Sequence, residues 1–191
     1  RYLVSDLFSN IEFSSEAFPF MSVRTGTVSG IDVRIFRISF SGELSYEINI
    51  PAKYGLSLWK TCIELGKEYE ITPYGTETMH VLRAEKGFII VGQDTDGSVI
   101  PEDAGMSWMV DLKKDFIGKR SLSRSDMSRK DRKQLVGILS YNPTEILPEG
   151  SQITEESGFD RPKSMIGHIT SSYYSANLGH SIALALIKDG S

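Results

Sequence analysis

Glu47 and Arg83 are the two charged residues whose positions most suggest a ligand site. Glu47 falls in the middle of an alternating segment, on the face opposite Tyr46, Ile48 and Ile50. A carboxylate there either faces solvent on a one-sided sheet or lines a polar cavity. In a cavity its two oxygens can accept two hydrogen bonds from an amino-pyrimidine edge, as in a pterin. The residues alone leave both alternatives open.

Arg83 stands in the last turn of a predicted helix. In one interpretation it stabilises the negative helix end or pairs with a neighbouring acid. In the other it is a fixed cation for an anionic ligand group or for a buried acid. The helix pattern by itself does not decide between them.

Other polar residues carry weaker signals for chemistry. Asp94 and Asp96 lie in a Gly- and Asp-rich loop, but the glycine and glutamate positions of a calcium loop are not matched, which favours loop capping. His80, His168 and His180 lack metal-ligand spacing and are interpreted as structural or exposed. No glycine-rich phosphate loop and no nucleophile triad is legible. We therefore predict no metal site.

The element that must position Glu47 is a predicted hairpin. Its first strand alternates over residues 31–35 and changes phase at Phe36, which suggests a bulge or a strand buried on both faces. A turn at residues 41–43 leads to the second strand, residues 45–50. The two segments are predicted to pair antiparallel.

Two helices are predicted after this hairpin. Pro51 opens the first helix. The apolar face of that helix is formed by Tyr54, Leu58, Cys62, Leu65 and Tyr69. The second helix covers roughly residues 76–86 and stops at Gly87. Strands and helices in this order predict an α+β fold.

The C-terminal part is predicted to be all-β. Short apolar strands at residues 135–139, 165–169 and 182–187 are separated by Gly, Pro and Ser turns, a pattern typical of a small antiparallel barrel or sandwich. Residues 111–134 hold nine Lys or Arg against four Asp and are interpreted as a solvated connector. The predicted domains are thus a lobe at 1–110, this connector, and a β domain at 135–191.

Composition excludes several classes of protein. The 191 residues carry a net charge of -4, which gives no field attracting nucleic acid or an anionic membrane. No apolar stretch approaches the roughly 20 residues that span a bilayer. Cys62 is the single cysteine, so an internal disulfide is excluded and a reducing, cytoplasmic compartment is favoured.

Several segments, in order along the chain, resemble blocks of the aminomethyltransferase family. Residues 40–48 (FSGELSYEI) resemble its signature, aromatic-Thr-Gly-Glu-x-Gly-aromatic-Glu-Ile, in which x is any residue. Residues 82–87 (LRAEKG) resemble Leu-Arg-Leu-Glu-Ala-Gly, and residues 115–119 (DFIGK) and 167–172 (GHITSS) resemble later blocks. Together these blocks cover nearly the whole chain.

The resemblance implies a partial aminomethyltransferase fold, with a ferredoxin-like α+β lobe followed by a small β-barrel. It also implies a tetrahydrofolate site between lobes. In that site Glu47 would hold the pterin ring, and Arg83 corresponds to the ligand-site arginine of the family. Phe40 takes the place of the family's common tyrosine, without its hydroxyl, and is the third residue that the resemblance implies in folate binding. Ser41 and Ser45 replace the usual Thr and Gly.

Within this family, residues 90–97, 132–137 and 181–186 resemble the alpha subunits of multi-subunit sarcosine oxidases. This resemblance implies partner subunits, with FAD, FMN and NAD bound elsewhere in the complex. The alternatives are a glycine-cleavage T-protein, a dimethylglycine oxidase or dehydrogenase, and a non-catalytic folate-binding module.

The chain begins with Arg1 rather than Met and closes on a turn at residues 188–191, so we expect it to be cut from a longer polypeptide. The resemblance implies that the family's catalytic aspartate lies upstream and that a ligand-contacting tyrosine lies downstream. We therefore expect the chain by itself to lack oxidase activity.

Overall fold

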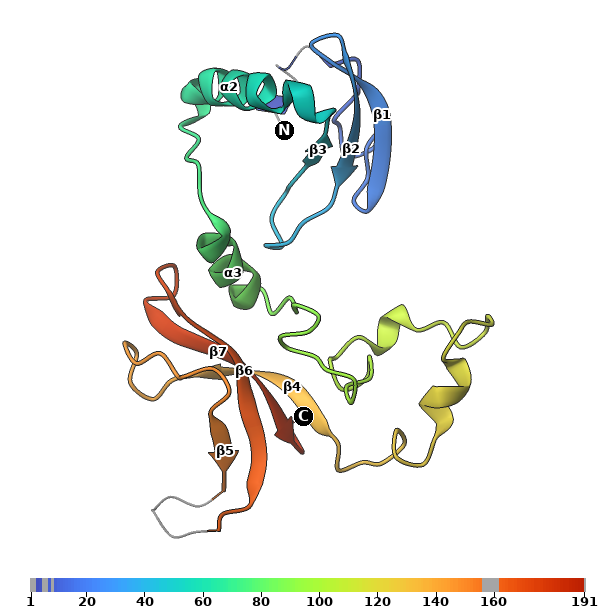
Figure 1. Cartoon of the computed structure of the whole chain (residues 1–191), viewed down its shortest axis with the longest axis vertical. Helices are drawn as coiled ribbons and strands as arrows, with labels where there is room; N and C mark the ends of the chain where they lie inside the picture. The colour runs from blue at the N-terminus through green and yellow to red at the C-terminus, as the bar shows by residue number, and fades with distance from the viewer. Residues whose placement is uncertain (1–2, 5–6, 8, 156–161, 191) are drawn as a thin grey trace. The chain divides into compact units, whose positions relative to one another are not determined.

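The computed structural model describes residues 3–4, 7, 9–155 and 162–190, so the ends at Arg1 and Ser191 lie outside the described residues. The chain divides into two compact units, Arg1–Met79 and His80–Ser191. Figure 1 shows the elements of each unit, which are described separately below.

The first unit contains a three-stranded antiparallel sheet in the order β1-β2-β3. Its strands are β1 (Ser22–Val28), β2 (Ile31–Arg37) and β3 (Glu47–Asn49). Ser29 and Gly30, both with positive φ, form the tight turn between β1 and β2, as type I′ hairpins require. The pairing of β2 with β3 confirms the predicted hairpin. The sequence pattern missed β1.

The phase change at Phe36 does not come from a bulge. The register between β1 and β2 is continuous from Ser22↔Arg37 to Val28↔Ile31. Phe36 is half-buried on the face opposite the core, and β2 ends one residue later. Ile38 and Phe40 therefore belong to the connection between strands rather than to β2.

The core of the first unit lies between one face of this sheet and helix α2 (Gly55–Gly66). Its fully buried members are Leu7, Phe13, Phe18, Val28, Val33 and Ile35. Leu58, Cys62 and Leu65 of α2 pack against them, which confirms the predicted helix face over these positions. A short 3-10 turn, Ala52–Tyr54, follows Pro51 and precedes α2. Tyr69 lies beyond α2 in a second such turn, Lys67–Tyr69, and is exposed.

Helix α3 (Thr76–Glu85) confirms the second predicted helix. Gly87 ends it with a φ of 75°. The Gly87 N–H donates to the carbonyl of Ala84, and the Phe88 N–H donates to the carbonyl of Arg83. This pair of bonds is the Schellman arrangement, which satisfies the last carbonyl groups of a helix.

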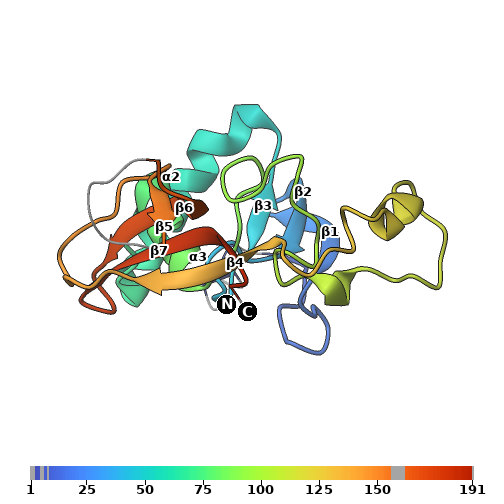
Figure 2. The same ribbon diagram turned by 90° about the horizontal axis from the view of Figure 1, so that it is seen from below.

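The second unit contains a four-stranded antiparallel sheet in the order β4-β7-β6-β5. Its strands are β4 (Lys133–Leu139), β5 (Gln152–Thr154), β6 (Met165–Ser175) and β7 (His180–Lys188). Figure 2 shows β7 between β4 and β6. Three of these strands were predicted, and the all-β character after residue 134 is confirmed. β4 and β5 form the two edges of this sheet.

The charged stretch is partly anchored rather than fully solvated. It contains one short 3-10 turn, Lys119–Ser123, and another, Ser107–Met109, lies just before it. Near its end, Arg132 is 14% exposed and donates to the carboxylate of Asp103 from Nε at 3.0 Å and from Nη2 at 2.5 Å. Within the described ranges, no helix has the length and apolar character to cross a membrane.

Candidate functional site

Glu47 projects from the face of the first sheet that points away from the core. On β3 its neighbour Ile48 packs against the buried cluster, so Glu47 and Asn49 point the other way. Both of these polar side chains are exposed. Phe36 of β2 lies directly opposite Glu47 in the antiparallel register, so its ring shares this outer face. The carboxylate thus has a half-buried aromatic ring beside it.

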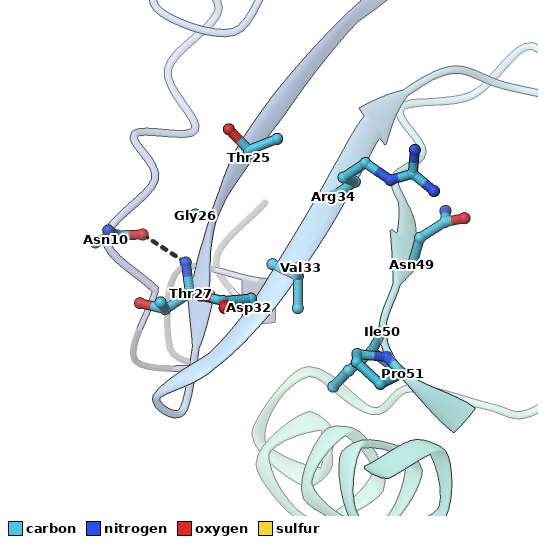
Figure 3. A pocket seen from close by; sticks show the side chains of 10 residues that line it. All are labelled: Asn10, Thr25, Gly26, Thr27, Asp32, Val33, Arg34, Asn49, Ile50 and Pro51. Carbon is cyan, nitrogen blue, oxygen red and sulfur yellow. Dashed lines mark hydrogen bonds between the residues drawn. The ribbon is translucent and has the colours of Figure 1, made fainter. Parts of the chain in front are cut away.

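The same outer face continues from Glu47 toward a broad hollow of about 780 Å³ in the first unit. Arg34, opposite Asn49, and Thr25, opposite Arg34, are among the residues that line it. Figure 3 shows Arg34 and Asn49 extending to the same side from neighbouring strands. This face combines a carboxylate, a guanidinium, an amide and an aromatic ring. Such a set can read both the plane and the edge of a polar heterocycle.

Phe40 is 39% exposed in the connection between β2 and β3. Its ring is therefore available for a contact, and its role in folate binding stays a prediction. The strand pattern correctly placed Glu47 opposite Tyr46, Ile48 and Ile50, since all three pack on the core cluster. It did not single out Arg34 or Phe36. Their positions opposite β3 follow from the register, which the sequence pattern alone did not reveal.

Arg83 lies in the second unit, with its side chain completely buried. Its guanidinium forms an ion pair with Asp94. It also donates to the carbonyl of Phe88 at 3.1 Å, to the Ser171 hydroxyl at 2.7 Å and to the Tyr173 hydroxyl at 3.3 Å. The structure therefore pairs Arg83 with a buried acid, one of the roles that the sequence left open. A direct contact between Arg83 and folate stays a prediction.

Asp94 is the acid at the centre of this buried network. The Ile90 N–H donates to its carboxylate at 2.8 Å and the Thr170 hydroxyl at 2.7 Å, and the Ser171 hydroxyl donates to it as well. Burial alone would raise the pKa of Asp94. These three hydrogen bonds, together with the Arg83 charge, outweigh burial and hold the pKa below its ordinary value. Asp94 is therefore a carboxylate at neutral pH.

Sequence reasoning gave Asp94 and Asp96 the same loop-capping role, and the structure separates them. Asp96 is exposed and accepts from the N–H and hydroxyl of Ser98, which is loop capping. Asp94 instead joins helix α3, its own loop and strand β6 through Arg83 and Ser171. Across the part of the chain that the structure describes, no group of three or more His, Cys, Asp or Glu residues is placed to hold a metal ion.

Family models match most of the chain. Residues 1–114 match the model described as the GCVT N-terminal domain, and residues 133–191 match the glycine cleavage T-protein C-terminal barrel domain. The chain belongs to the glycine cleavage T-protein family. This membership confirms the resemblance inferred from the sequence blocks. The family models and the compact units place boundaries differently, so the predicted domain limits of 1–110, 111–134 and 135–191 stay predictions.

Relatives in this family carry two kinds of name. Over its whole length the chain is 53% identical to sarcosine oxidase subunit alpha of Corynebacterium sp. (strain P-1), of which it covers 20%. It is 40% identical, over 94% of its length, to sarcosine oxidase subunit alpha of Rhizobium meliloti (strain 1021), of which it covers 18%. It is 32% identical, over 93% of its length, to the aminomethyltransferase of Thermotoga petrophila, of which it covers 46%.

The fold agrees with that of a solved family member. Glycine cleavage system aminomethyltransferase T from Bartonella henselae superposes with a TM-score of 0.78 at 21% identity, over 98% of this chain and 48% of that one. The predicted partial aminomethyltransferase fold of class α+β is therefore confirmed. The chain spans about a fifth of its sarcosine oxidase relatives and under half of the aminomethyltransferases.

Proposed function

We propose that this chain is the tetrahydrofolate-binding part of a sarcosine oxidase alpha subunit. The identity of 53% to a protein of that name supports the assignment, because it extends over the whole chain. The proposal includes other subunits as partners and places FAD, FMN and NAD elsewhere in the complex. The family membership supports folate as the ligand of this region.

The observation that carries the proposal is the position of Glu47 on the outer sheet face with Phe36 directly opposite. A pterin presents an amino group and a ring N–H side by side, and a carboxylate can accept from both. A neighbouring aromatic ring offers a flat surface for the same heterocycle. Phe40 is the further residue of this unit that we propose to contact the pterin. The folate role of Arg83, whose side chain is buried in the second unit, stays a prediction.

The proposed chemistry is the oxidative demethylation of sarcosine to glycine. A flavin elsewhere in the complex would accept the two electrons removed from sarcosine, and the resulting iminium carbon would be transferred to the nitrogens of tetrahydrofolate. Glycine leaves, and 5,10-methylene-tetrahydrofolate is the other product. Holding tetrahydrofolate in place makes the capture step effectively unimolecular and avoids the release of free formaldehyde.

A second candidate function is aminomethyl transfer of the glycine-cleavage type, or a related dimethylglycine oxidation. The identity of 32% to an aminomethyltransferase over 93% of the chain favours keeping it. Both functions require the same folate site and differ in the source of the one-carbon unit. A non-catalytic folate-binding module is the remaining alternative.

The test uses the full-length protein that carries this chain, with its partner subunits. Sarcosine labelled with ¹³C in its methyl group is supplied with tetrahydrofolate, and products are followed by NMR. The proposal predicts label in the methylene bridge of 5,10-methylene-tetrahydrofolate. Label found in free formaldehyde alone, at saturating tetrahydrofolate, would contradict one-carbon capture. Sarcosine left unreacted, with aminomethyl transfer observed instead, would favour the second candidate.

A further inference from the structure

Arg34 lies next to Glu47 on the outer sheet face and is exposed. The register pairs Arg34 of β2 with Asn49 of β3, and Glu47 lies two residues before Asn49 on β3. Arg34 and Glu47 are therefore diagonal neighbours, a relation that puts Cα atoms about 7–8 Å apart and within reach of a long side chain. An arginine in this place can touch whatever the Glu47 carboxylate holds.

The Arg34 guanidinium has no hydrogen-bond or ion-pair partner in the described part of the chain. Asp32, on the same strand and the same face, is the nearest acid in sequence, yet no ion pair joins the two. The bonds that Arg34 can donate are therefore not used within the protein. Arg37 on the same strand differs, because its guanidinium donates to the carbonyl of Phe18.

The edge of a 2-amino-4-oxo pterin carries three polar groups in a row. The amino group and the ring N–H are donors, and the 4-oxo oxygen beside them is an acceptor. Glu47 as a carboxylate only accepts, so it can serve the two donors and not the oxygen. Reading the third group requires a donor next to Glu47, and the guanidinium of Arg34 is a donor that cannot be deprotonated in proteins.

We propose that Arg34 is a specificity residue that donates a hydrogen bond to the 4-oxo oxygen of the pterin held by Glu47. This inference rests on the proposed folate function and adds the third position of the recognition pattern. Phe36, opposite Glu47, supports the ring from one side. Arg34 thereby distinguishes a 4-oxo from a 4-amino heterocycle, a difference that hydrogen-bonding sites read strongly.

The experiment measures binding of two ligands, tetrahydrofolate and its 4-amino-4-deoxy counterpart, to the full-length protein by calorimetry. Wild type and Arg34→Met are compared, since methionine keeps much of the apolar stem and removes every donor. We expect Arg34→Met to weaken tetrahydrofolate binding by roughly 10-fold to 100-fold, the range for a bond from a charged donor. Binding of the 4-amino ligand should change little. The 4-amino ligand also lacks the ring N–H. This difference between the ligands is the same for wild type and for Arg34→Met, so it does not affect the comparison of the two proteins.

Two further variants sharpen the result. Arg34→Lys keeps a cationic donor and should recover part of the preference for tetrahydrofolate. Lys60→Met, on the exposed side of α2, removes a positive charge from the same unit and should leave both affinities unchanged. Equal weakening of both ligands by Arg34→Met, or no change in either, would overturn the role of Arg34. Failure of wild type to bind tetrahydrofolate at all would instead overturn the proposed function and this inference with it.

Discussion

Arg83 and Asp94 form an ion pair in which both side chains are fully buried. The pair links the last turn of α3 to the loop that follows, and the Ser171 hydroxyl accepts from Arg83 while it donates to Asp94. Buried charges are tolerated when they are paired and hydrogen-bonded. This cluster therefore fixes α3 against β6 within the second unit.

Replacement of the buried acid should be strongly destabilising. We expect Asp94→Asn to lower the stability of the second unit by about 3–5 kcal/mol, because the Arg83 charge remains buried without a counter-charge. Native-state hydrogen exchange of the amides in α3 and β6 of the full-length protein measures this. Asp96→Asn is the matched control, since Asp96 is exposed and only caps its loop. Equal exchange in the two variants would contradict the account.

The same carboxylate predicts a loss of stability in acid. The pKa of Asp94 is lower in the folded protein than in the unfolded chain, so the unfolded state binds more protons as the pH falls. The contribution of Asp94 is fully present above its ordinary unfolded pKa of about 4 and is lost as the pH falls through the lower folded value. Urea unfolding between about pH 2 and pH 6 should show this decrease. Asp94→Asn should show a smaller decrease, and parallel curves would be evidence against the assignment.

Two strand glycines of the second sheet should respond oppositely to alanine. A Cβ on Gly167 would lie 2.4 Å from the carbonyl oxygen of Leu186, whereas a Cβ on Gly137 would meet nothing within 4 Å. Gly167→Ala should therefore separate β6 from β7 and lose about 1–3 kcal/mol, as overpacking does. Gly137→Ala should leave the stability unchanged or raise it by about 0.4–1 kcal/mol, because alanine lowers the conformational entropy of the unfolded chain. Chemical unfolding midpoints compare the two, and equal destabilisation would show that the close approach is not the cause.

Much of the fold could be predicted from the sequence, because each helix or strand shows its own hydrophobic periodicity. The α2 face at Leu58, Cys62 and Leu65 and the stop of α3 at Gly87 are local features, and both are confirmed. β1 was missed because its alternation, SVRTGTV, is mostly polar with a glycine in the middle. Pairing with β2, rather than its own hydrophobicity, makes it a strand.

The candidate site could be predicted only in part, because some of its contacts join residues that are far apart in the sequence. The phase of Glu47 within its own strand could be read from its neighbours, and it is confirmed. The burial of Asp94 depends on Thr170 and Ser171, which lie more than 70 residues away in the sequence. A local sequence pattern does not predict such a contact. The position of Arg34 beside Glu47 likewise depends on which residues pair across β2 and β3.

The central claim is that Glu47 holds the pterin ring of tetrahydrofolate. Glu47→Gln keeps the size of the side chain and replaces one acceptor by a donor, so one pterin N–H loses its partner. Calorimetric titration of tetrahydrofolate into the full-length protein should show weakening by about 1–3 kcal/mol, the range for a polar group left unpaired. Glu68→Gln, an exposed glutamate of the same unit, serves as the control and should bind as wild type does. If Glu47→Gln binds tetrahydrofolate as tightly as wild type, Glu47 is a surface carboxylate and the proposed site is wrong.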